Sequence, residues 1–329
     1  MRHPLLYIIL LFIGIFNASA QDSTAVNSPQ TASVAPASPV KLNRSAEALG
    51  ISPQVEARLK KLSNRPVNIA LFAVDRRDKE ELGNSDVIMV ISIDQQSGKV
   101  KMASIMRDTY VKIDGHGMDK LNAAFALGGP QLAIKTLNQN FDLDIKDYLN
   151  VDFFGAAKIV DALNGIEVNV KAAELPHLKN YLDELAVIEK IPAVHVLQPG
   201  LQKLNGKQAV AYTRIRAVGN GDYERTERQR NVLISLFNKI KGSGQELFPV
   251  FATQILPNME TSMANFTLLN FAGNILNSKT KTIDQARFPL DKESTGKRIN
   301  NIWYLTTDLK TTANSLHNFI YNSPPAVKK

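Results

Sequence analysis

Three apolar runs decide the fold, and they read VNIALFAV (67–74), VIMVISI (87–93) and VKMASI (100–105). Each has the length and the β-branched content of a strand, and a QQSG turn at 95–98 separates the last two. Runs without polar alternation are typical of strands that are buried on both faces. The stretch therefore predicts the middle of a sheet that is covered on two sides.

Helical and strand patterns alternate after this stretch. The spacing of apolar residues predicts a short helix at 46–62 before the sheet, strands at 148–153 and 166–170, and helices at 130–141, 154–163, 204–212, 223–240, 245–256 and 266–276. This alternation favours an α/β fold in which helices cover both faces of the sheet.

The first twenty residues differ from the rest of the chain. Arg2 and His3 precede an apolar run at 4–16, and small residues follow it as ASA at 18–20. The run is shorter than the roughly 20 residues that span a bilayer, which suits a signal peptide, while a short membrane anchor stays open. In both cases the positive end stays inside, so we expect an extracytoplasmic protein of the cell envelope.

The remaining chain divides by composition. Residues 21–64 form a predicted flexible linker with the short helix at its end, since 21–40 are mostly Ser, Thr, Ala, Pro and Gln. Residues 65–322 form one predicted folded domain, and 323–329 a tail. No second linker interrupts the strand and helix signals between them.

Composition excludes several kinds of site. The chain has no cysteine, so disulfides, thiolate metal sites and thiol nucleophiles are absent. Its five histidines lack metal-binding spacing, and there is no Gly-x-Ser-x-Gly motif. The net charge of +8 would suggest nucleic acid inside a cell. For an exported protein we expect no nucleic acid, and phosphate-bearing polymers or the membrane surface instead.

Arginines gather in one short segment. Arg214 and Arg216 share a face if that segment is extended, and Asp222 begins a predicted helix on which Arg225 and Gln229 stand four residues apart. Guanidinium groups keep their charge and match phosphate oxygens with a planar fork. The segment predicts a diphosphate site, although a salt-bridged surface helix would have a similar sequence.

Acidic residues lie at the predicted strand ends. Asp75 follows the first strand and Asp86 precedes the second, so both can lie at the same edge of the sheet. Mg²⁺ prefers a few protein oxygens together with water and substrate phosphates, which makes these two carboxylates candidate ligands. Arg107, directly after the third strand, can reach the same edge. Each carboxylate alone would also suit a turn or cap.

Six motifs together resemble the LytR-CpsA-Psr (LCP) family over roughly residues 65–321. They are SD at 85–86, RDT at 107–109, DKLNAA at 119–124, LNGKQA at 204–209, YTRIR at 212–216 and DYERTERQ at 222–229. Each motif is weak alone, whereas their order and spacing as a set are specific.

This resemblance implies a three-layer α/β/α catalytic domain with a central mixed sheet and a hydrophobic pocket for a polyprenyl chain. It implies a phosphotransferase that moves a glycan phosphate, such as teichoic acid or capsular polymer, from undecaprenyl pyrophosphate to peptidoglycan. The family's functional residues can be carried over by position. The implied pyrophosphate ligands are Arg107, Arg214, Arg216, Arg225 and Gln229. The implied Mg²⁺ ligands are Asp75 and Asp86, and the implied catalytic residues are Arg107 and Asp222. We therefore expect Arg107→Ala or Arg214→Ala to abolish transfer.

One position departs from the family pattern. Many members carry Arg two residues before the aspartate of the Ser-Asp pair, where this chain has Asn84. An amide brings no charge, so binding of a diphosphate is expected to be weaker, unless Arg76 or Arg77 compensates.

Two alternative functions stay open. One is a polyprenyl pyrophosphate phosphatase that uses water as acceptor at the same site. The other is a non-catalytic lipid-binding or regulatory envelope protein, which is favoured if Asn84 has cost the site its charge balance.

Overall fold

A computed structural model describes residues 41–62, 64–74, 82–277 and 282–321. The predictions for the signal or anchor, most of the linker, the tail, and Asp75, Arg76 and Arg77 lie outside these residues. None of the helices within them is both long and apolar enough to cross a membrane.

A six-stranded sheet forms the centre of the domain, in the order β10-β3-β2-β1-β6-β9. Its strands are β1 (Val67–Val74), β2 (Ser85–Ile93), β3 (Val100–Ile105), β6 (Asp147–Asp152), β9 (Glu260–Thr261) and β10 (Asp284–Phe288). Neighbouring strands are antiparallel except for the parallel pairs β1–β6 and β10–β3. The central mixed sheet is therefore confirmed, as are the predicted strands at 67–74 and 100–105.

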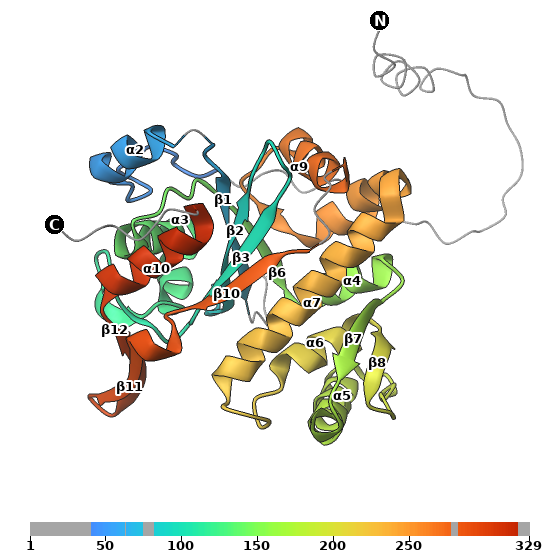
Figure 1. The fold of residues 1–329 in the computed structure, drawn as a ribbon. Helices are drawn as coiled ribbons and strands as arrows, with labels where there is room; N and C mark the ends of the chain where they lie inside the picture. Colours follow the sequence, from blue (N-terminus) through green and yellow to red (C-terminus); the bar gives the residue numbers. More distant parts are fainter. Residues whose placement is uncertain (1–40, 63, 75–81, 278–281, 322–329) are drawn as a thin grey trace, which may run out of the picture. The chain divides into compact units, whose positions relative to one another are not determined.

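Helices cover both faces of this sheet (Figure 1). Side chains alternate across a strand, so Phe72 and Val74 of β1 pack with α2 (Pro53–Lys60), α3 (Ala123–Phe141) and α10 (Leu309–Tyr321). Ile69 points to the other face, in a core with residues of α7 (Asp222–Ser243) and α9 (Asn265–Asn277). The result is the predicted three-layer α/β/α arrangement.

A smaller group of elements packs around its own core beside the sheet. Its elements are α4 (Phe153–Ala162), β7 (Ile166–Val170), η1 (Ala172–Glu174), α5 (Leu175–Glu189), β8 (Gly200–Leu204) and α6 (Gly206–Arg214). Strands β7 and β8 form an antiparallel pair, and Leu204, Tyr212 and Leu178 are buried in the core between them and the helices. This group matters for function because α6 leads directly into α7.

The remaining elements are short. They are the hairpins β4 (Tyr110–Ile113) with β5 (Gly117–Lys120) and β11 (Ser294–Ile299) with β12 (Ile302–Thr307), and the helical turns η2 (Gly244–Glu246), α8 (Leu247–Val250), η3 (Phe251–Ile255), η4 (Leu256–Asn258) and η5 (Asp291–Glu293). The helix expected at 245–256 is thus a chain of short turns. The sequence patterns did not predict α5, α10 or either hairpin.

Glycines account for two differences from the predicted helices. The helix expected at 46–62 is helical only from Pro53, since Gly50 has a positive φ of 67° and a Cβ there would lie 2.7 Å from Gln139. The helix expected from residue 130 is the second part of α3. Its first part ends at a kink where Gly129 has φ 61° and ψ −158°.

Candidate active site

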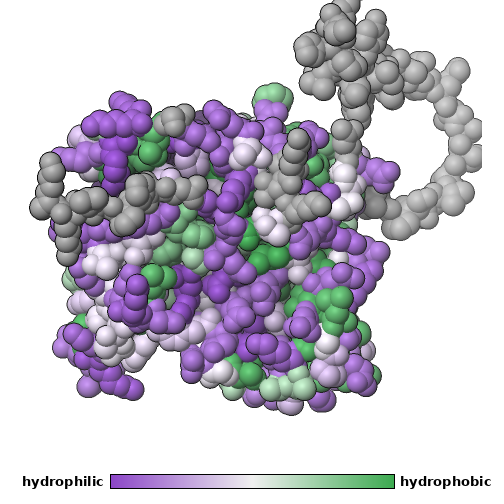
Figure 2. Space-filling view, viewed as in Figure 1, coloured by the Kyte–Doolittle hydropathy of each residue, from purple (hydrophilic) through white to green (hydrophobic). Residues whose placement is uncertain are grey.

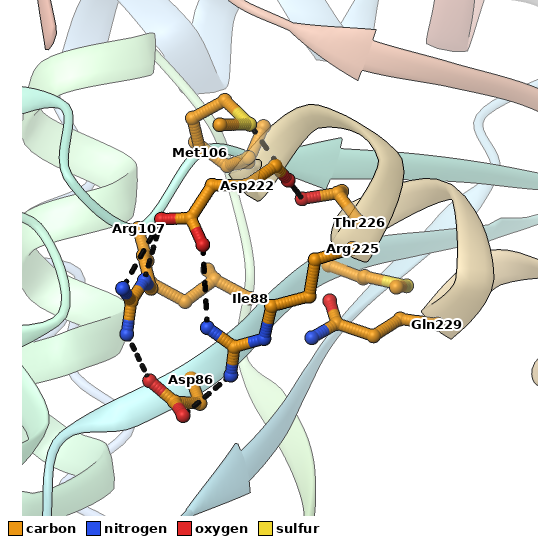
Figure 3. Close-up of a pocket in the computed structure, with 10 residues that line it drawn as sticks. Asp86, Ile88, Met106, Arg107, Asp222, Arg225, Thr226 and Gln229 are labelled. Carbon is orange, nitrogen blue, oxygen red and sulfur yellow. Dashed lines mark hydrogen bonds and ion pairs between the residues drawn. The ribbon is translucent and has the colours of Figure 1, made fainter. Parts of the chain in front are cut away.

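Three chain segments that are distant in sequence meet at one end of the sheet. Strand β2 begins at Ser85, β3 ends at Ile105 and α7 begins at Asp222. Because β2 and β3 are antiparallel, the start of one lies beside the end of the other. Asp86 and Arg107 thereby reach the first turns of α7 across a pocket (Figure 3). The pocket is lined by Asp86, Ile88, Met89, Ile105, Met106, Arg107, Asp222, Arg225, Thr226 and Gln229.

Two arginines and two carboxylates alternate around this pocket. Arg107 donates to Asp86 through Nη1, and to Asp222 Oδ2 through Nε at 3.2 Å and Nη2 at 3.1 Å. Arg225 donates to Asp86 Oδ2 at 2.5 Å, and its Nη1 lies 3.5 Å from Asp222 Oδ1. The four side chains are between 4% and 21% exposed. They form a ring of paired charges that is largely shielded from water.

Two atoms of this ring lack a hydrogen bond within the part of the chain that the structure describes. They are Arg225 Nε and Asp222 Oδ1, and both are buried. Arg216 lies at the rim, 47% exposed, with its Nε 3.4 Å from Asp222 Oδ1. The ring therefore keeps one buried N–H donor and one half-exposed guanidinium that further oxygen atoms can bind.

The pairing keeps the carboxylates ionised. Burial alone would raise the pKa of Asp86, but the charges of Arg225 and Arg107 outweigh it and lower that pKa. Burial also opposes the charge of Arg107, yet the adjacent carboxylates of Asp86 and Asp222 raise the pKa of Arg107. Burial would raise the pKa of Asp222 too, and Arg107 again reverses the direction. Asp86, Arg107 and Asp222 are therefore charged at neutral pH.

The pocket brings together most of the predicted site residues. Asp86, Arg107, Asp222, Arg225 and Gln229 line it, with Arg216 beside Asp222. The substituted position, Asn84, is exposed just before β2 and does not line the pocket. Asp75 lies outside the described residues, although its neighbour Val74 pairs with Ser85 at the start of β2.

Arg214 lies away from this pocket. It is the last residue of α6, so the extended run that would put it on one face with Arg216 is not present. Its Nη2 is 3.6 Å from Glu184 Oε1, and its guanidinium carbon lies 5.0 Å from the centre of the Tyr181 ring. In this arrangement a carboxylate and aromatic rings bind Arg214.

Sequence reasoning missed two parts of the site. The first is the apolar floor, which is formed by Ile88, Met89, Ile105 and Met106. The first three stand within the predicted strands and Met106 directly follows one of them, so their position at the same sheet end was a usable signal. Together with the charged ring they place an apolar surface directly beside an anion site.

The second missed part is a buried ion pair that supports α7. Arg228 Nε donates to Glu174 Oε1 at 2.7 Å, and the two side chains are 3% and 1% exposed. Arg228 also donates to the carbonyls of Ile215 at 2.9 Å and Val218 at 3.1 Å. These bonds fix the loop that carries Arg216 against α7. No sequence signal distinguishes Arg228 from its arginine neighbours.

Of the two predicted Mg²⁺ ligands, Asp86 lies within the described residues. These residues contain no group of three or more His, Cys, Asp or Glu side chains placed to hold an ion. Asp86, one of the two predicted Mg²⁺ ligands, has both oxygens bonded to arginines. Its chemistry suits an ion that arrives with substrate phosphates, because Mg²⁺ commonly uses only one or two protein carboxylates.

This fold and pocket define a class of protein. It is a three-layer α/β domain in which a ring of paired arginines and carboxylates lies beside an apolar floor at the end of the mixed sheet. The sequence model of the LytR_cpsA_psr family matches residues 22–319. The chain belongs to this family.

Curated relatives carry two kinds of name. The chain is 33% identical over 251 residues to the polyisoprenyl-teichoic acid–peptidoglycan teichoic acid transferase TagU of Oceanobacillus iheyensis, covering 72% of this chain and 70% of that protein. It is 38% identical over 163 residues to the regulatory protein MsrR of Staphylococcus aureus, but this match covers 48% of the chain and 45% of MsrR.

A solved structure supports the fold. The LytR-CPS2A-psr family protein YwtF (TagT) of Bacillus subtilis with bound octaprenyl pyrophosphate lipid aligns with a TM-score of 0.59 and 22% identity. The alignment covers 78% of this chain and 91% of that chain. At this identity the likeness is one of fold.

Proposed function

We propose that this protein is an envelope phosphotransferase that moves a glycan phosphate from a polyprenyl pyrophosphate carrier to peptidoglycan. The observation that carries the proposal is the ring of Asp86, Arg107, Asp222 and Arg225 over an apolar floor. A prenyl diphosphate joins a doubly charged anion to a long hydrocarbon, and this pocket offers a surface for each.

The arginines would bind the diphosphate by exchanging partners. Phosphate oxygens accept the same forked hydrogen bonds that Asp86 and Asp222 now accept from Arg107 and Arg225. One more oxygen would satisfy the buried Nε of Arg225, which has no partner among the described residues. Arg216 at the rim and Gln229 at the pocket wall would complete the grip. Arg214 would take part only after leaving Glu184.

The apolar floor would receive the start of the prenyl chain. The pocket encloses only about 10 Å³, which is roughly the room for one water molecule and far below the roughly 300–1,000 Å³ typical of small-molecule sites. A long prenyl chain therefore requires the floor to open. Met89 and Met106 suit such a change, because the unbranched Met side chain adapts its shape more readily than a β-branched one.

The reaction needs little covalent help from the protein. An acceptor hydroxyl oxygen would form a bond to the glycan-linked phosphorus, while the bond from that phosphorus to the bridging oxygen breaks and prenyl monophosphate leaves. Arg107 and Arg225 would neutralise the charge that grows on the phosphate oxygens. Asp222 would orient the hydroxyl or accept its proton, and its Oδ1, which has no hydrogen bond within the described chain, supports this role.

Mg²⁺ would be held by Asp86 and substrate phosphates, with Asp75 as the second protein ligand expected from the family resemblance. When bound, the ion would supply charge neutralisation between the two phosphates. Asp86 can serve it once the diphosphate has drawn Arg107 or Arg225 away from the carboxylate.

The relatives' names support the transferase over the alternatives. TagU, whose match covers most of both chains, is named a teichoic acid transferase acting on peptidoglycan, and TagT was solved with octaprenyl pyrophosphate. Regulatory names belong to relatives such as MsrR and biofilm regulatory protein A, and these matches cover less than half of each relative. Both substrates named for TagU belong to the cell envelope, in agreement with the extracytoplasmic location expected from residues 1–20.

A reconstitution with and without acceptor tests the proposal. The full chain, a polyprenyl pyrophosphate-linked glycan, Mg²⁺ and peptidoglycan should yield glycan-bearing peptidoglycan and prenyl monophosphate in equal amounts. Arg107→Ala should abolish both products while leaving the circular dichroism spectrum unchanged. Release of prenyl phosphate without any need for peptidoglycan would instead indicate a phosphatase, and binding without turnover a non-catalytic lipid-binding protein.

A further inference from the structure

A second groove lies on the neighbouring face of α7. It has a volume of about 440 Å³ and is lined by Asn220, Tyr223, Glu224, Glu227, Arg230, Arg287 and Asp291. Its walls are the first turns of α7, the end of β10 and the turn η5, where Figure 2 shows hydrophilic residues gathered. None of these side chains takes part in the ring of the first pocket.

Two arginines in this groove are held in fixed positions. The guanidinium of Arg287 lies 3.9 Å from the centre of the Tyr223 ring and pairs with Asp291. Arg230 donates from Nε to Gln285 at 2.9 Å. Because these groups are already ordered, a ligand that binds them gives up little side-chain entropy.

The groove has donor capacity that the described chain does not use. Arg287 Nη1 is buried and has no hydrogen-bond partner among the described residues, and the side chain as a whole is 15% exposed. Burial and the neighbouring charge of Arg287 lower the pKa of Arg230, so the two cations stand close together. An oxygen acceptor in the groove would give Arg287 Nη1 the hydrogen bond that it lacks.

Acceptors line the same groove. Glu224 is occupied, since its Oε2 accepts from the backbone N–H of Asn220 at 2.5 Å. Glu227 and Asp291 are exposed to solvent at the edge of the groove. A bare anion would be repelled by these carboxylates, whereas a sugar hydroxyl both donates and accepts and therefore suits a mixed lining. The Arg287 guanidinium covers one face of the Tyr223 ring, so a sugar would meet the other face and the hydroxyl group of this residue.

The groove stands close to the proposed reaction centre. Both sites use the first turns of α7: Asp222, Arg225 and Thr226 line the pocket, and Tyr223 and Glu227 line the groove. A helix is only about 10–12 Å across with its side chains, so the two sites are neighbours. A sugar in the groove would therefore lie within reach of a phosphate in the pocket.

We propose that this groove is a glycan subsite that binds a sugar ring through Tyr223, Arg230 and Arg287. Its role in catalysis rests on the proposed function, in which the sugar belongs either to the acceptor glycan or to the glycan of the donor. The sugar-binding chemistry is common to both sources, and the experiment below separates them.

Binding to the full chain can be measured by saturation-transfer NMR and titration calorimetry. The acceptor arm uses a phosphate-free peptidoglycan disaccharide, and the donor arm uses a polyprenyl diphosphate-linked disaccharide. One of these two disaccharides should bind in the groove. Arg230→Gln and Arg287→Gln should each weaken the binding of that disaccharide by about tenfold, as expected for loss of a hydrogen bond from a charged donor. Arg298→Gln, an exposed arginine on β11, is the matched control and should change nothing.

Two results would overturn the glycan subsite. One is the absence of any saturation transfer or heat from both disaccharides, and the other is equal binding by wild type, Arg230→Gln and Arg287→Gln. Inorganic phosphate that displaces the disaccharide at equal concentration would also contradict it. Arg107→Ala separates the two proposals: retained binding of the acceptor disaccharide supports the subsite even if transfer itself is never observed.

Discussion

The buried pair of Arg228 and Glu174 should be a main determinant of both stability and site geometry. We consider Arg228→Met, which keeps most of the side-chain volume but removes the charge and all the guanidinium donors. Glu174 would then hold an uncompensated charge at 1% exposure, and the carbonyls of Ile215 and Val218 would lose their donors. The loop that carries Arg216 would also lose its tie to α7.

The expected size of the effect follows from this burial. Removing one partner of a buried ion pair costs about 3–5 kcal/mol, because the remaining charge is desolvated without compensation. This is a large share of the roughly 5–15 kcal/mol that holds a typical domain folded. A second change, Glu174→Gln, should restore much of the loss. It removes the charge but keeps an oxygen that can still accept from the backbone N–H of Lys171, as Glu174 does at 2.8 Å.

Urea unfolding monitored by circular dichroism measures these differences, once refolding is shown to be reversible. We expect Arg228→Met to lower the unfolding free energy by about 3–5 kcal/mol, with the double variant losing clearly less. Arg298→Met, on the exposed β11, should stay within about 0.5 kcal/mol of wild type. If Arg228→Met loses less than about 1 kcal/mol, or the double variant is no more stable than the single one, the pair does not act as argued.

Three further predictions concern the site and pH. Arg107→Ala should lower the turnover number at least about 100-fold, as loss of one donor to a developing charge does. The structure revises the expectation for Arg214→Ala from complete loss to a loss of less than about tenfold, because Arg214 does not line the pocket. Transfer kinetics measure both losses, and equal losses would contradict the assignment. Asp86→Asn should abolish the response of transfer to added Mg²⁺, and an unchanged metal titration would exclude Asp86 as a ligand. Burial and the charge of Arg58 lower the pKa of His317 below 6.5, so the unfolded chain binds a proton at this residue before the folded chain does as the pH falls. The stability of the wild-type protein should therefore decrease as the pH falls below about 6.5. Urea titrations of His317→Gln should lack this part of the decrease.

Much of the fold could be predicted because its signals are local. The runs that became β1 and β3 are continuous and apolar, so periodicity located them within a residue at each end. The antiparallel hairpins were missed because their stability comes from contacts that a local pattern does not contain. Helix α10 is amphipathic, with Ala313, Leu316 and Ile320 buried on one face, so its spacing of apolar residues was a usable signal. Short exposed strands such as β11 have even less local signal.

The sequence predicted which residues form most of the site but not how their side chains are arranged. Motif positions identified Asp86, Arg107 and Arg225, which the fold brings into direct contact across 139 residues of sequence. The direction of Arg214 could not be predicted, since it depends on where α6 ends and on Glu184 in another helix. The support from Arg228 was hidden for a related reason. Arg225 and Arg228 look alike in sequence and both are buried, and only their partners, Asp86 and Glu174, distinguish them.

The ring of paired charges has a consequence for how a diphosphate would bind. Two isolated guanidinium groups in a shielded pocket would carry a desolvation cost of several kilocalories per mole each. Asp86 and Asp222 offset that cost in the folded protein and hold Arg107 and Arg225 in position before any ligand arrives. Binding then exchanges one set of oxygen acceptors for another without creating or burying a new cation. Such a pocket binds its anion less tightly than unpaired arginines would, but its donors are already oriented when negative charge grows on the transferred phosphate.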